Sequence, residues 1–228
     1  MNNNNGYSLI ELLVAMGIAM IVSAAIFVTH QVQAQGKITQ EVTLEMQQAG
    51  RAALGMMTRE LRMAGCDPNG NSGAGFLTAT ANEVEFTMDF RGDPDPTNPR
   101  PFEPNGSTAD PSEWVRYGIN TSGSLGRETG GAGGLQPLIR NIDALNFVYL
   151  DADGNVTADL EAIRSVQISL VIRSAATRDR GLLRAHTDTN VYENLQGDPV
   201  FTPTGAQRNF RRIQFNTEVH CRNMGGET

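Results

Sequence analysis

The chain has 228 residues, a net charge of −7 at pH 7 and a sequence pI near 5.0. Such an acidic chain offers no broad cationic surface for phosphates, which argues against nucleic acid as a partner. Its two cysteines, Cys66 and Cys221, exclude a disulfide-dense scaffold and a four-cysteine zinc site.

The chain begins with a short polar segment that ends at Gly6, and an apolar run follows to Val28. A helix of this length can cross a bilayer at ~1.5 Å per residue, and the run is too long for an ordinary secretory signal. Glu11 is the single charge inside it. A carboxylate in such a run is unfavourable, by roughly 2.5 to 3.5 kcal/mol at the centre of the span and less towards its end. Glu11 therefore calls for a functional explanation.

An amphipathic pattern continues directly from the apolar run, with apolar residues at intervals of three and four. They are Ile38, Val42, Met46, Ala49, Ala53, Met57, Leu61 and Ala64. This spacing is typical of a helix that buries one stripe. No proline occurs before Pro68, so the sequence predicts one helix from Tyr7 to Ala64, about 85 Å long. Gly65 and Pro68 form the expected stop signal.

The rest of the chain has the alternating pattern of β-strands. We predict strands over residues 83–90, 114–120, 142–150, 163–172 and 213–219. Turn-rich segments at 93–101, 130–134 and 178–205 separate them and should form surface loops. No helix-sized crossover lies between the strands, so an antiparallel meander is expected. The predicted fold class is α+β, with the long helix packed on one antiparallel sheet.

The N-terminal stretch resembles the class III signal of type IV prepilins. The resemblance rests on Gly6 at the polar border, the aromatic Tyr7, Ser8-Leu9-Ile10-Glu11 and the bilayer-length run. Residues 48–54, 59–66, 149–154 and 211–223 resemble PilW-type minor pilins. Tyr7 stands where the signal usually has phenylalanine, and the leader lacks its usual basic residue. The J-type pseudopilins of type II secretion share this layout and remain an alternative.

The resemblance implies a processing and assembly pathway. Residues 1–6 would be a leader that a prepilin peptidase removes between Gly6 and Tyr7, and the same enzyme would N-methylate Tyr7. Residues 7–29 would be the transmembrane and assembly half of the helix, 30–66 its amphipathic half, and 67–228 a globular β-rich domain. The product would be a minor pilin that is built into, or primes, a type IV pilus and supports assembly, adhesion or motility.

The same resemblance sets the expected location and partners. The precursor would be a single-pass protein of the inner membrane, with a cytoplasmic N-terminus and a periplasmic domain. After assembly it would lie in the pilus at the cell surface. Its partners would be other pilins, the prepilin peptidase, the inner-membrane assembly platform and the lipid bilayer. No cofactor is implied, and no catalytic motif favours an enzyme. A tip adhesin that uses the loops at 93–101 and 130–134 is a further hypothesis.

Two readings of Glu11 remain open. A new α-amino group at Tyr7 would be cationic, and Glu11 of a neighbour lies ~6 Å along the helix axis, so a stagger of that size would pair the two charges. Such a pair would set register more than it adds stability, because desolvation offsets much of the attraction. Alternatively, Ser8 and Glu11 form a local capping box. Both can hold, one in the monomer and one in the assembly.

The other candidate sites are weaker. Cys66 and Cys221 form a candidate disulfide, or else two free thiols packed as small apolar groups. Asp151-Ala152-Asp153-Gly154-Asn155 resembles the start of a calcium loop but lacks the later ligands, so a β-turn is the favoured interpretation. No metal site is predicted, because the three histidines, His30, His186 and His220, are scattered.

Overall fold

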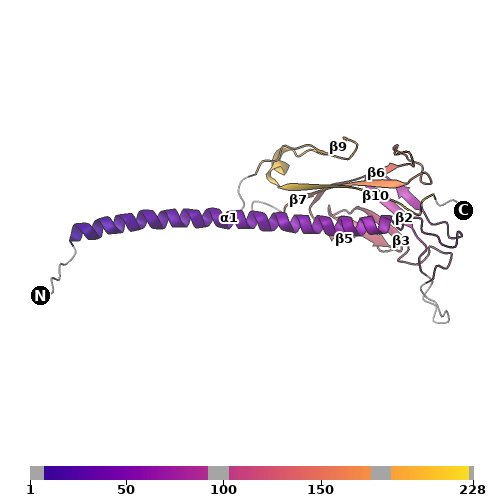
Figure 1. Cartoon of the computed structure of the whole chain (residues 1–228), viewed down its shortest axis with the longest axis horizontal. Coiled ribbons are helices and arrows are strands. Elements are labelled where there is room, and N and C mark those ends of the chain that lie inside the picture. The colour runs from indigo at the N-terminus through magenta and orange to yellow at the C-terminus, as the bar shows by residue number, and fades with distance from the viewer. Residues whose placement is uncertain (1–7, 92–102, 176–185, 226–228) are drawn as a thin grey trace.

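The computed structural model describes residues 8–91, 103–175 and 186–225. It contains one long helix, α1, which spans Leu9–Leu61 over 53 residues. At 1.5 Å per residue this helix is about 80 Å long. Its first half extends beyond the rest of the molecule, and its second half lies along the β-domain (Figure 1). The predicted helix is confirmed, although it ends three residues earlier than expected, and its predicted start at Tyr7 lies outside the described residues.

The buried stripe of α1 matches the predicted one closely. Its buried residues are Met46, Gly50, Ala53, Met57 and Leu61. After the C-cap Arg62, the chain turns through Gly65, whose φ of 73° lies in the left-handed region that glycine adopts at little cost. Gly65 therefore ends the helical segment, as the sequence predicted.

The strands form two main sheets and a small hairpin, and all of their pairings are antiparallel. The five-stranded sheet has the order β1-β2-β3-β4-β5, with β1 Phe76–Ala79, β2 Glu83–Thr87, β3 Trp114–Ile119, β4 Leu125–Thr129 and β5 Gln136–Ile139. The three-stranded sheet has the order β10-β7-β6, with β6 Ile142–Leu150, β7 Ser165–Arg173 and β10 Arg212–His220. The hairpin pairs β8 Tyr192–Glu193 with β9 Pro199–Phe201, and a short 3-10 helix, η1, follows at Gly205–Asn209.

The predicted α+β fold, a long helix packed on antiparallel β-structure, is confirmed, and its strands divide into two main sheets. Strand β5 has only four residues and contains Pro137, which has no N–H to donate to a further strand. The chain then turns at Asn141, whose φ is 61°, and β6 pairs with β7 instead of continuing the first sheet. The nine-residue β6 and β7 offer a much longer ladder than β5 could.

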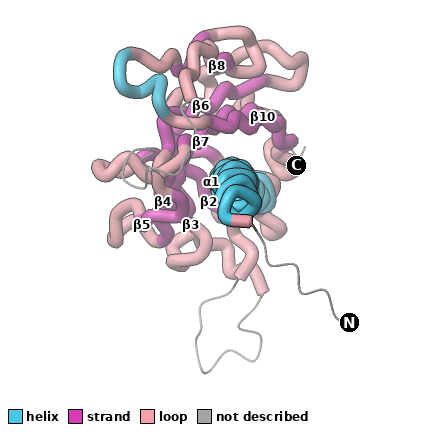
Figure 2. Tube along the Cα trace, turned by 90° about the vertical axis from the view of Figure 1, so that its left-hand side faces the viewer, coloured by secondary structure: helices cyan, strands magenta, loops and turns pink. Residues whose placement is uncertain are grey.

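Helix α1 packs in the angle between the two sheets. Viewed along its axis, the three-stranded sheet lies above it and the five-stranded sheet beside it (Figure 2). The core lies where the three meet, and its largest fully buried side chains include Tyr117, Phe86, Met57, Leu61 and Leu125. Strand β7 is central, and its residues from Ser165 to Ile172 are all buried. On the face of the three-stranded sheet away from α1, the hairpin buries Tyr192 against Ala144 and Val171.

Candidate assembly site along the N-terminal helix

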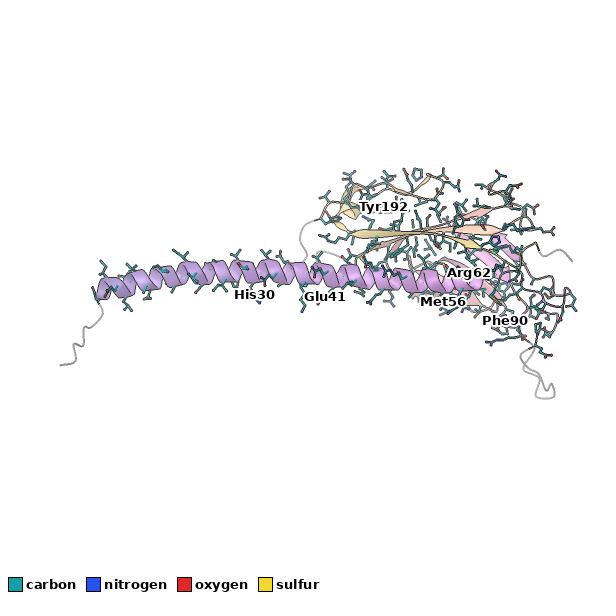
Figure 3. The ribbon with its side chains drawn as sticks, in the orientation of Figure 1. His30, Glu41, Met56, Arg62, Phe90 and Tyr192 are labelled. Atoms are coloured by element: carbon teal, nitrogen blue, oxygen red, sulfur yellow. The ribbon has the colours of Figure 1, made fainter. Side chains whose placement is uncertain are left out.

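The N-terminal half of α1 is free of contact with the domain. All residues from Ser8 to Gln33 are exposed, and they include Leu9, Ile10, Ile21 and Phe27. In Figure 3, His30 lies on the part of the helix that projects alone, whereas Met56 lies where the domain covers it. This segment is the one helix in the described residues that is long and apolar enough to cross a membrane. An apolar surface of this extent requires lipid or other helices around it.

The predicted capping box is present at the start of α1. The carboxylate Oε2 of Glu11 accepts the Ser8 N–H at 3.0 Å, and Ser8 Oγ accepts the Ile10 N–H at 3.4 Å. Glu11 therefore holds the first turn of the helix together in the monomer. Gly6 and Tyr7, the predicted cleavage and methylation residues, lie outside the described residues. The pairing of Glu11 with a neighbouring amine stays a prediction.

A partly buried ion pair joins α1 to the five-stranded sheet. Arg127 on β4 donates from Nε to Glu60 Oε2 and from Nη2 to Glu60 Oε1, each at 2.9 Å. Tyr117 on β3 donates to Glu60 Oε2 at 2.5 Å. Burial, followed by the Glu60 carboxylate, raises the pKa of Tyr117 far above its ordinary value. Burial alone would lower the pKa of Arg127, but Glu60 outweighs it and raises that pKa. The three residues thus set the rotation and height of α1 on the domain.

Sequence reasoning missed Glu60. The available signal was its position one residue before the buried Leu61, at the edge of the apolar stripe. A carboxylate at such an edge needs a buried partner or a route to solvent. Its partners lie 57 and 67 residues further along the chain, on strands whose pairing the sequence did not reveal.

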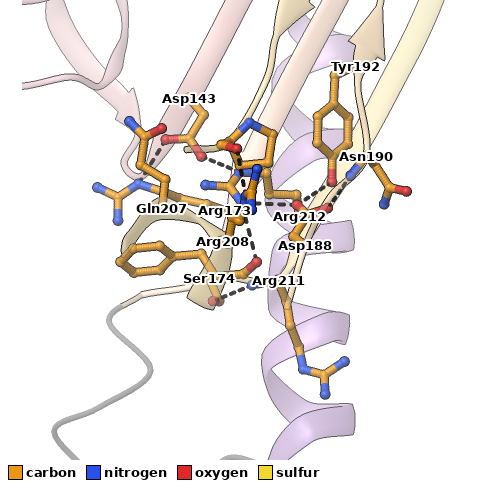
Figure 4. Close-up of polar contacts among 12 residues, drawn as sticks. Asp143, Arg173, Ser174, Asp188, Asn190, Tyr192, Gln207, Arg208, Arg211 and Arg212 are labelled. Atoms are coloured by element: carbon orange, nitrogen blue, oxygen red, sulfur yellow. Dashed lines mark hydrogen bonds and ion pairs between the residues drawn. The ribbon is translucent and has the colours of Figure 1, made fainter. Parts of the chain in front are cut away.

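A second polar cluster fastens the outer layer of residues 186–211 to the three-stranded sheet (Figure 4). The Arg212 side chain is fully buried, and it donates from Nε to Asp143 Oδ2 at 2.6 Å and from Nη1 to Asp188 Oδ2 at 3.0 Å. Tyr192 also donates to Asp188 Oδ2, at 2.8 Å. Burial alone would raise the pKa of Asp188, but hydrogen bonds from Asn190 and Tyr192 and the charge of Arg212 lower it. Burial and Asp188 raise the pKa of Tyr192 to about 12.

The two cysteines are free thiols in the structure, so the candidate disulfide is not formed here. Cys221 is fully buried and Cys66 is partly buried, and both contact the same hydrophobic core. Burial raises the pKa of Cys221 to about 12, and burial together with Asp89 raises the pKa of Cys66. Both therefore stay protonated near neutral pH and pack as the small apolar groups that the alternative interpretation described.

The Asp151 turn, the three histidines and the two predicted loops do not come together in one site. Asp151 accepts N–H groups from Asp153 at 2.9 Å and from Asn155 at 2.8 Å, which confirms a turn at this point. His30 lies on α1, His186 in the outer layer and His220 at the end of β10. Within residues 8–91, 103–175 and 186–225, no three His, Cys, Asp or Glu side chains are grouped so as to hold a metal ion. The loop at 130–134 is exposed, and most of the loop at 93–101 lies outside the described residues.

Comparison with known proteins identifies the N-terminal segment. The prokaryotic N-terminal methylation motif matches residues 1–27. The chain therefore carries at its start the methylation signal that the resemblance predicted, and one long helix packed on antiparallel sheets follows it. The match ends at residue 27, so the PilW-type resemblance of the later segments stays a prediction.

The chain is also similar to one solved structure. It is the type IV-like pilin TTHA1219 from Thermus thermophilus, to which the chain is similar with 14% sequence identity and a TM-score of 0.48. The similarity covers 78% of this chain and 95% of that chain. No curated protein sequence matches the chain.

Proposed function

We propose that this chain is the precursor of a pilin subunit that assembles through the exposed half of α1. The observation that carries the proposal is the contrast within one helix. Residues 8–33 are exposed, and those from Leu9 to Val28 are almost wholly apolar, while a stripe from Met46 to Leu61 is buried against the domain. A bilayer can hold the exposed half before assembly, and the same half of neighbouring subunits can cover it afterwards.

The N-terminal motif supplies the processing step of this proposal. A prepilin peptidase cuts between Gly6 and Tyr7 on the cytoplasmic side, and Tyr7 receives the N-methyl group. The cut creates a cationic amine, and Glu11 of an adjacent subunit pairs with it across the stagger of the helices. The observed cap keeps the Glu11 carboxylate at the first turn of α1, which supports this role, because the carboxylate lies where the new amine would approach.

The narrower assignment is a minor pilin of the PilW type, anchored in the inner membrane with its domain in the periplasm, and later carried in the pilus. The inner-membrane assembly platform and other pilins are its proposed partners. A J-type pseudopilin has the same design and is the alternative. The exposed glycine-rich loop at 130–134, which follows β4 at the end of the domain away from the apolar half of α1, supports an added adhesive role at a pilus tip.

Mass spectrometry of the N-terminus tests the proposal. The chain is expressed with and without a co-expressed prepilin peptidase, and the membrane fraction is analysed intact and after digestion. We expect a mature chain that begins with N-methylated Tyr7 only when the peptidase is present. An intact Met1 under both conditions, or a cut after Ala25, would overturn it. A Gly6→Lys variant is the matched control and should stay uncut.

A further inference from the structure

The end of the domain nearest the apolar half of α1 carries a set of basic side chains, which we call the basic rim: Lys37, Arg140, Arg208 and Arg211. Arg140 lies in the turn between β5 and β6, Arg208 in η1 and Arg211 directly before β10. The strand register brings these positions to one end, because Ile142 pairs with Ile172 and Arg212 pairs with Arg173. Lys37 lies on the part of α1 where the domain begins.

The position of this rim along α1 follows from helix geometry. The apolar segment Leu9–Val28 has 20 residues and is ~30 Å long, which equals the hydrocarbon thickness of a bilayer. The headgroup layer extends roughly 5 to 8 Å further on each side, which corresponds to about four or five residues of helix. Arg211 lines a groove of about 480 Å³ against α1 together with Val32, Gln35 and Gly36. If Val28 lies at the hydrocarbon boundary, Val32 lies within the headgroup layer.

The rim residues are accessible and only weakly engaged. Arg140 and Arg208 are exposed, and Arg211 is half-buried. None of these three arginines forms an ion pair with another described residue. In Figure 4, the Arg211 guanidinium points away from the buried cluster and lies beside α1. Lys37 is 78% exposed and its one acidic partner, Glu41, is 4.0 Å away and also exposed, so this pair is weak.

Two acidic groups at this end, Asp143 and Asp188, are already paired with arginines, whereas Glu41 is exposed beside Lys37. Asp143 pairs with Arg173 at 3.1 Å and with Arg212 at 2.6 Å, and Asp188 pairs with Arg212 at 3.0 Å. By contrast, the opposite end of the domain carries the acidic turns at Asp151–Asn155 and 159–161, which lie beyond the Leu150 to Ser165 end of the sheet. The chain is acidic overall, and Arg59, Arg62 and Arg222 at the far end are exposed as well, but only the rim cations lie next to the membrane.

We infer that the basic rim is a docking surface for anionic phospholipid headgroups on the membrane from which α1 projects. Helical side chains lean toward the N-terminus of their helix, so Lys37 extends toward the lipid. Each cation near an anionic surface strengthens the attraction, and three or four of them suffice to orient a domain. The lipid contact would hold the domain upright on the bilayer before assembly. This inference rests on the proposed insertion of α1 in a membrane.

The test uses the full-length chain in detergent and native mass spectrometry, with phosphatidylglycerol or phosphatidylcholine as the added lipid. We expect phosphatidylglycerol to bind at least about fivefold more tightly at low salt, and the difference to shrink at high salt. The variant R140Q/R208Q/R211Q should lose this preference. The matched control R59Q/R62Q/R222Q removes three exposed arginines from the far end of the domain and should retain it.

Three results would overturn the inference: equal binding of the two lipids by the wild type, the same loss in the far-end control, or loss of the preference when ~10 mM inorganic phosphate is added. The last result would indicate a site for free anions. Retention of the wild type in carbonate-washed membranes is measured in parallel. Failure of that retention would contradict the proposed function, whereas retention without a lipid preference would contradict only the basic rim as a lipid surface. Melting curves verify that both triple variants fold.

Discussion

The hydroxyl of Tyr117 donates a hydrogen bond of 2.5 Å to Glu60, the carboxylate that α1 presents to the five-stranded sheet. Tyr117 is fully buried, so this contact forms in a medium where a charged group must be satisfied by protein. Arg127 completes the arrangement with two hydrogen bonds to the same carboxylate. Helix α1 and the five-stranded sheet are therefore held rigidly together at this contact.

The first prediction concerns this contact. Glu60→Gln should destabilise the domain by about 1 to 2 kcal/mol, because it leaves the partly buried Arg127 charge without a counter-charge. Chemical denaturation followed by circular dichroism measures the effect. Glu41→Gln is the matched control, since Glu41 is 63% exposed on the same helix and should change stability by less than about 0.5 kcal/mol. Equal effects of the two variants would show that the Glu60 contact contributes no special stability.

The second prediction uses two glycines of α1. A Cβ at Gly50 would overlap the ring of Phe215, whereas one at Gly55 would meet nothing within 4 Å. Gly50→Ala should therefore destabilise by about 1 to 3 kcal/mol, and Gly55→Ala should stabilise by about 0.5 to 1 kcal/mol. Melting temperatures of both variants measure the difference. A Phe215→Leu change should partly restore Gly50→Ala, and stabilisation by Gly50→Ala alone would contradict the observed packing.

The third prediction concerns pH. The folded state lowers the pKa of Asp188 below its unfolded value of about 3.9. Its contribution to stability is therefore complete above that value and is lost as the pH falls through the lower folded pKa. We expect the protection of amides in residues 186–211, measured as exchange relative to the unfolded chain at the same pH, to fall below about pH 4. In Asp188→Asn, the same amides should be poorly protected already at pH 7. In an Asp198→Asn control they should stay protected, because Asp198 forms no ion pair with Arg212.

The fourth prediction concerns assembly. Glu11→Gln removes the charge but keeps the shape of the cap. The amount of protein in the membrane and the stability of the domain should therefore stay unchanged. Because the charge pairs between subunits in our proposal, incorporation into filaments should fall about tenfold. Immunoblots of sheared filaments and membranes measure the ratio. Ser8→Ala is the control, since it weakens only the local cap. Normal incorporation of Glu11→Gln would restrict Glu11 to capping.

The fifth prediction concerns the thiols. Native protein should react slowly with iodoacetamide at both cysteines, and more slowly at Cys221, because burial raises its pKa to about 12 and hides the sulfur. Unfolded protein should take up two labels. A mass about 2 Da lower for protein recovered from the periplasm, restored by reductant, would show that a disulfide forms there.

Much of the architecture was predictable because it depends on local pattern. The apolar run, the period of the stripe from Ile38 to Ala64 and the Gly65 stop all act within a few residues, and each was confirmed. The longer strands β6, β7 and β10 were also found, since alternation or continuous apolarity marks them. The short strands β1, β4, β5, β8 and β9 were missed, because two to five residues carry too little pattern.

By itself, the sequence determined the N-terminal features: the motif over residues 1–27 and a helix long enough to span a bilayer and continue into the domain. Only the tertiary structure decided how that helix is held. The split into two sheets, the bidentate pair of Glu60 with Arg127 and the burial of Arg212 between two aspartates depend on residues 24 to 69 positions apart. Contacts of that range follow from strand pairing and packing, which no local pattern specifies.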